Sequence, residues 1–74
     1  MDLLEVLVTM THCMYISDLA QPHVLPLIRR AVLGLQARDY SLREWNDTVE
    51  YITRQNKQFD TCEEARAFLL EFRP

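Results

Sequence analysis

Residues 1–16, MDLLEVLVTMTHCMYI, decide the fold of this 74-residue chain, because the fold class depends on whether they form a helix or a strand. Asp2 and Glu5 make a D-x-x-E capping box, in which each side chain accepts a backbone N–H of the first helical turn. Two apolar stripes follow at helical spacing. The inner stripe, expected to face the core, is Leu3, Leu7, Met10 and Met14, and beside it lies a second stripe of Leu4, Val8 and Tyr15. The pattern predicts an N-terminal helix that is apolar over most of its circumference.

A strand is the competing interpretation of the same stretch. Residues from Val6 to Ile16 are rich in β-formers, and a strand here would be of the fully buried type. The capping box and a run longer than a typical strand both favour the helix. The alternative to a four-helix bundle is therefore three helices preceded by a short N-terminal strand.

Two more helices are indicated in the middle of the chain. Pro22 and Pro26 are tolerated in a first helical turn, where the missing N–H has no partner anyway. Ser41 and Glu44 form a second capping box, with Tyr40 and Trp45 at the flanking hydrophobic positions. The expected ranges are from near His23 or Val24 to about Gln36, and from Ser41 to near Gln55.

The last helix follows a loop expected over Asn56–Phe59. Its cap is either Thr61 with Glu64 or Asp60 with Glu63. The core positions expected on the last three helices are Leu25, Ile28, Val32, Leu35, Leu42, Trp45, Val49, Ile52, Ala65, Phe68, Leu69 and Phe72. With one glycine in the chain, tight turns are too few for an all-β fold. We therefore predict a single all-α domain over residues 1–74, a small four-helix bundle.

Charge is unevenly distributed along the chain, which has a formal net charge of −3. Residues 1–23 carry acids but no Lys or Arg, whereas residues 24–38 carry Arg29, Arg30 and Arg38 and no acid. These three arginines are a candidate contact for an anion or an acidic partner, although isolated basic pairs are common on solvated helix faces. A small nucleic-acid-associated regulator that uses them is the alternative function, and the acidic balance of the chain disfavours it.

The sequence shows no catalytic or metal-binding pattern. Cys13 and Cys62 form no C-x-x-C pair, and two His with two Cys at these spacings do not make a zinc ligand set. His12 is adjacent to Cys13, but neighbouring residues on a helix point in different directions. We expect no enzyme activity, cofactor, metal or small-molecule substrate.

No signal peptide is expected, because the N-terminal stretch lacks a basic region and contains Asp2 and Glu5. No apolar run approaches the ~18 residues of a membrane span. A reducing, cytoplasmic location without membrane attachment is the expectation.

The surplus of apolar residues at the N-terminus suggests a function. Three amphipathic helices already supply a minimal core, so part of an apolar fourth helix is free to face another chain. The expected protein-binding residues are Leu4, Val8, Thr11 and Tyr15. We therefore predict a small non-enzymatic regulator or adaptor, which forms a homodimer or binds a protein partner through its N-terminal helix.

Overall fold

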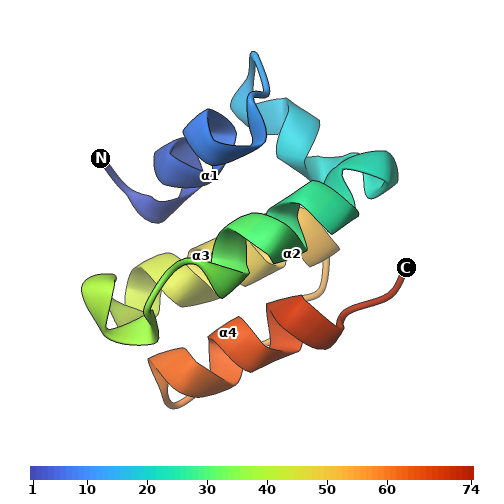
Figure 1. Cartoon of the computed structure of the whole chain (residues 1–74). Coiled ribbons are helices and arrows are strands. Elements are labelled where there is room, and N and C mark those ends of the chain that lie inside the picture. Colours follow the sequence, from blue (N-terminus) through green and yellow to red (C-terminus); the bar gives the residue numbers. More distant parts are fainter.

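A computed structural model describes all 74 residues, and it is a bundle of four α-helices without a strand. The helices are α1 (Leu3–Thr11), α2 (Leu25–Leu33), α3 (Leu42–Thr53) and α4 (Cys62–Glu71). Helices α1 and α4 lie on opposite sides, and each packs against both α2 and α3, which lie between them (Figure 1). The all-α prediction is confirmed, and the alternative with an N-terminal strand is wrong.

Helix α1 begins as its capping box predicts and ends earlier than its apolar pattern suggests. The Asp2 carboxylate accepts the N–H of Glu5 at 3.0 Å, and Glu5 reaches back to the N–H of Asp2. His12 has a left-handed conformation (φ 60°), and the N–H of Cys13 donates a hydrogen bond to the carbonyl of Val8. This turn redirects the chain into the 3₁₀-helix η1 (Ile16–Ala20), so residues after His12 do not continue the stripes of α1.

Helix α2 is shorter than predicted at both ends. The 3₁₀-helix η2 (Pro22–Val24) precedes it, and Pro26 lies in its first turn. At the other end Gly34 is the C-cap, and the chain continues into the 3₁₀-helix η3 (Ala37–Asp39). Arg66 of α4 donates hydrogen bonds to the carbonyls of Leu33 and Leu35, two groups that a longer helix would have used internally.

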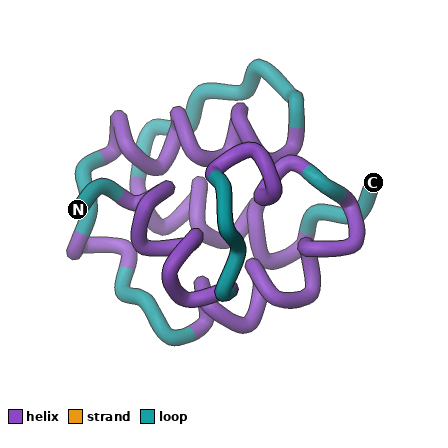
Figure 2. Tube along the Cα trace, turned by 90° about the horizontal axis from the view of Figure 1, so that it is seen from above, coloured by secondary structure: helices purple, strands orange, loops and turns teal.

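Helices α3 and α4 begin at the predicted caps, Ser41 and Thr61. Each hydroxyl accepts the backbone N–H of the glutamate three residues later, at 3.1 Å in both helices. The connection between α3 and α4 is a loop, as predicted, whereas the two earlier connections contain the 3₁₀-helices, and no strand is present (Figure 2). Within that loop the backbone of Phe59 is bonded to the side chain of Asn46.

The core lies where the four helices meet and contains most of the predicted residues. Trp45 is completely buried, and its indole N–H donates to the carbonyl of Ala37 at 2.8 Å. Leu19 of η1 also enters the core, which the sequence analysis missed. The buried hydrophobic residues are Leu3, Leu7, Leu19, Val24, Leu25, Ile28, Ala31, Val32, Trp45, Val49, Ile52, Ala65 and Leu69. Met10 and Met14, which we placed on the inner stripe of α1, are exposed, so that part of the prediction is wrong.

Candidate functional site

The predicted protein-binding residues of the N-terminal segment differ in their exposure. Leu4 and Val8 are half-buried and pack against the core of the same chain. Thr11 is buried, and its hydroxyl donates to the carbonyl of Leu7 at 2.7 Å, so the prediction that Thr11 contacts a partner is wrong. Tyr15 is 64% exposed. Of the four residues, only Tyr15 offers a whole side chain to another molecule.

An exposed apolar surface does exist, at the turn between α1 and η1. It consists of Met10, Met14, Tyr15 and Ile16, and we call it the α1–η1 surface. Met14 is 81% exposed. The turn projects from one end of the molecule as the light-blue tip in Figure 1. Four large apolar side chains within seven consecutive residues are unusual on a small surface and are typical of a contact with another molecule.

The backbone of the turn positions these side chains. The left-handed His12 ends α1, and the N–H of Tyr15 donates to the Asp18 carboxylate at 3.2 Å, which begins η1. Asp18 three residues after Tyr15 was the sequence signal that a new helix starts here. Met14 was assigned to the core because the helical periodicity was extended through this turn. Met10 lies in the last turn of α1 and is exposed there.

The α1–η1 surface continues toward α2. The methyl group of Met10 lies 3.9 Å from the position that a Cβ atom would take on Gly34. Leu33, next to Gly34, is 65% exposed, and Leu27 on the same helix is exposed as well. Three exposed residues of α2, each three positions after the one before, lie on the same side of the helix. They are Leu27, Arg30 and Leu33, and we call this side the outer face of α2.

The three arginines predicted as an anion contact have different surroundings. Arg29 is half-buried, and its Nη1 donates to the carbonyl of Phe72 at 3.1 Å, which ties the end of α4 to α2. Arg30 is exposed on the outer face of α2. Arg38 lies in η3, on the rim of a cleft that also contains Arg66. One of the three therefore has a structural role, and a fourth arginine joins Arg38.

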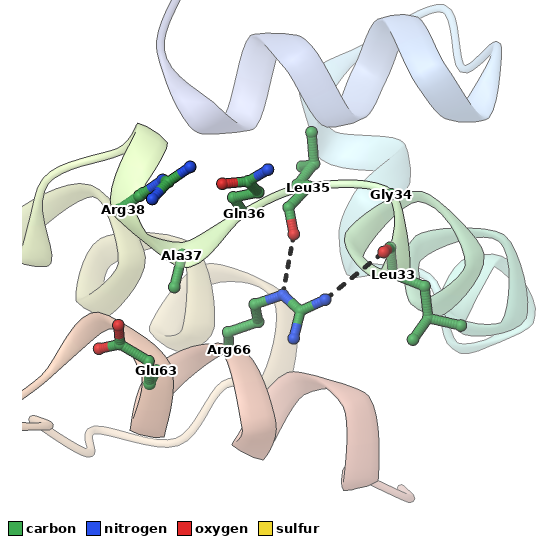
Figure 3. A pocket seen from close by; sticks show the side chains of 8 residues that line it. All are labelled: Leu33, Gly34, Leu35, Gln36, Ala37, Arg38, Glu63 and Arg66. Atoms are coloured by element: carbon green, nitrogen blue, oxygen red, sulfur yellow. Dashed lines mark hydrogen bonds between the residues drawn. The ribbon is translucent and has the colours of Figure 1, made fainter.

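The cleft that contains Arg38 and Arg66 has a volume of about 570 Å³ and is open to solvent. One wall is the chain from the end of α2 to η3, and the other is the first part of α4 (Figure 3). Its lining residues are Leu33, Gly34, Leu35, Gln36, Ala37, Arg38, Glu63 and Arg66. We call it the Arg38–Arg66 cleft.

The cysteines and histidines are not assembled into a reactive or metal-binding group. No three His, Cys, Asp or Glu side chains are close enough together to hold a metal ion. The Sγ of Cys13 lies 3.2 Å from the Thr11 hydroxyl, and that of Cys62 lies 3.5 Å from the carbonyl of Tyr40. Both cysteines are half-buried thiols, each close to a local oxygen.

None of the helices is long and apolar enough to cross a membrane. No protein-family model matches the chain, and comparisons with curated proteins and with solved structures found no match.

Proposed function

We propose that this chain is a small protein-interaction module that self-associates through the α1–η1 surface. The observation that carries the proposal is the exposure of Met10, Met14, Tyr15 and Ile16 at one projecting turn. Methionine adapts its shape to the surface that it contacts, and tyrosine supplies a large rigid area with a polar tip. Such side chains are favoured at the centres of protein interfaces.

The apolar area is large enough to support association. Full burial of one side chain of this size contributes about 1.5–3 kcal/mol. Two copies offer eight such side chains at roughly half exposure on average, which corresponds to about 6–12 kcal/mol. The loss of translational and rotational freedom opposes association by about 4–15 kcal/mol, so the expected result is a dimer of modest affinity.

Charge complementarity supports a second copy as the occupant. The acidic Asp18 lies next to the α1–η1 surface, at the start of η1, whereas the outer face of α2 presents the exposed Arg30 between Leu27 and Leu33. In a two-fold symmetric dimer the same pair of surfaces meets twice. The α1–η1 surface of each protomer would then pack on the outer face of α2 of the other, so that apolar side chains meet and opposite charges face each other.

The biological role that we propose with this activity is that of a small non-enzymatic regulator or adaptor. The proposal includes a reducing, cytoplasmic location, which is compatible with two cysteines that are not joined in a disulfide. Dimerisation would present the remaining surfaces of the module in duplicate.

Sedimentation velocity over a range of concentrations tests the proposal. We expect the average mass to increase with protein concentration and to approach that of a dimer before the concentration reaches about 1 mM. This corresponds to an association free energy of about −4 kcal/mol or better. Met14→Glu and Tyr15→Glu should each abolish the rise, because a charge would be buried without a partner. Gln58→Glu, which adds the same charge at an exposed loop position, should leave the rise unchanged.

The circular dichroism spectra of the Met14 and Tyr15 variants should match the unmodified spectrum, because both side chains are exposed. Arg30→Glu should weaken the dimer without unfolding the protomer. A chain that stays monomeric up to about 1 mM would refute self-association. A dimer that tolerates both glutamate substitutions would place its interface elsewhere.

A further inference from the structure

We propose that the Arg38–Arg66 cleft binds a carboxylate carried by an apolar residue, as at the C-terminus of a peptide. Its charged residues lie in η3 and α4, outside the proposed dimer interface, and of the residues assigned to that interface the cleft shares only Leu33. Four features support it: a pre-oriented guanidinium, a second arginine without an ion pair, a single opposing acid and an apolar rim.

The guanidinium of Arg66 is held in a defined orientation by the backbone. Its Nε donates to the carbonyl of Leu35 at 3.0 Å, and its Nη2 lies 3.5 Å from the carbonyl of Leu33. These carbonyls belong to the end of α2, where the helix dipole favours a cation. A guanidinium has five N–H donors, so three remain after these two contacts. In Figure 3 the third nitrogen, Nη1, points away from both carbonyls.

Arg38 adds a second cation that the chain does not neutralise. The only ion pair in the structure joins Arg43 to Asp47, so neither Arg38 nor Arg66 pairs with a carboxylate. Glu63 lines the cleft without contacting either guanidinium within ion-pair distance. Two arginines and one glutamate give the cleft a formal charge of +1, which matches a monoanion.

The remaining lining residues favour an amino-acid carboxylate over other anions. A carboxylate is planar and fits the donor geometry of a guanidinium. The Glu63 carboxylate and the Gln36 side-chain oxygen can accept the N–H of the residue that bears the ligand's carboxylate. Leu33 and Ala37 supply apolar contact for its side chain. A phosphate dianion would instead be repelled by Glu63 and would leave these acceptors and apolar contacts unused.

The test is an NMR titration that follows the backbone amides and the Nε–H of Arg38 and Arg66. The probes are N-acetyl-leucine, its uncharged amide, acetate and inorganic phosphate, at matched ionic strength. N-acetyl-leucine should give saturable shifts in the cleft with a Kd below about 10 mM, and its amide should give none. Acetate should bind more weakly, because it lacks the N–H and the apolar side chain. Equal binding of the amide, or tighter binding of phosphate, would overturn the proposal.

Arg38→Gln is the decisive variant, because its side chain is exposed and makes no hydrogen bond within the chain. It should weaken N-acetyl-leucine binding by about tenfold or more, the effect of removing one hydrogen bond to a charged group. Arg43→Gln removes another exposed arginine, one that does not line the cleft, and should leave the Kd unchanged. Equal Kd values for the Arg38 variant and the unmodified chain would refute the site.

Glu63→Gln tests why the cleft prefers a monoanion. Removing this carboxylate should tighten phosphate binding while N-acetyl-leucine still binds. An unchanged preference between the two anions would contradict the role that we assign to Glu63. A titration on monomeric Met14→Glu separates the two proposals, because Leu33 is then free of the proposed interface and the cleft should bind its probe in a chain that does not self-associate.

Discussion

Replacing Asn46 with alanine should destabilise the protein strongly, although the residue lies in neither a pocket nor a charged cluster. Its side chain is buried on α3 and bonds to both backbone groups of Phe59. The Oδ1 atom accepts the N–H of Phe59 at 2.9 Å, and the Nδ2 atom donates to its carbonyl at 3.3 Å. The side-chain amide therefore satisfies both backbone groups of Phe59 and holds the loop that leads into α4 against α3.

The size of the effect follows from these two contacts. Each hydrogen bond contributes about 1 kcal/mol, and a buried group that loses its partner adds about 1–3 kcal/mol where water cannot reach it. Alanine regains about 0.5 kcal/mol through its better helix propensity. We expect a net loss of about 2–4 kcal/mol in the free energy of unfolding. For a domain of this size that lowers Tm by roughly 8 °C or more.

Urea and thermal denaturation measure this loss, with Asn56→Ala as the matched control. Asn56 lies in the same loop, is exposed and makes no side-chain hydrogen bond within the chain. Hydrogen exchange gives a local readout, because the Phe59 amide should lose its protection in the Asn46 variant. If the two variants differ by less than about 0.5 kcal/mol, the assigned role of the Asn46 amide is refuted.

Three further predictions concern stability, and thermal denaturation tests each of them. Leu7→Ala should lose about 2–5 kcal/mol, whereas Met14→Ala should change the stability by less than about 0.5 kcal/mol, because only Leu7 is buried; equal losses would mean that both lie in the core. Ser41→Ala removes the cap of α3 and should cost about 1 kcal/mol, so an unchanged Tm would contradict its role. Trp45→Phe removes the indole donor from the carbonyl of Ala37, which keeps only the long bond from the N–H of Tyr40, and should cost about 1–3 kcal/mol, with Tyr51→Phe as a near-neutral control.

The sequence predicted an exposed apolar surface near the N-terminus, but most of the residues assigned to it are buried or half-buried. Tyr15 is exposed as expected, and Met10, Met14 and Ile16, which were not among the expected binding residues, are exposed as well. Leu4 and Val8 pack against the core instead of standing free, and Thr11 satisfies its hydroxyl inside the chain. Leu4, Val8 and Thr11 all lie within α1, so their burial results from the packing of α1 against α2 and α3. The left-handed His12 ends the helix, so the helical periodicity does not apply to the residues after it.

The Arg38–Arg66 cleft was not predictable as a site. Arg38 was named as an anion contact, but its companion Arg66 is 28 positions away in the sequence and belongs to another helix. Arg29 looked equivalent to Arg30 in the sequence, yet it binds the carbonyl of Phe72. Which arginine side chains lack a partner within the chain depends on contacts between distant segments. No local sequence pattern indicates such contacts.

The sequence by itself determined where three of the four helices begin, because capping is a local interaction between residues three positions apart. Asp2, Ser41 and Thr61 all cap helices as their spacing predicts. It also determined the helical class and most of the core, through the periodicity of apolar residues. Only the tertiary structure decided where the helices end, which apolar side chains remain exposed and which arginines share a cleft. Those outcomes depend on packing between segments that are far apart in the chain, where burial outweighs local preference.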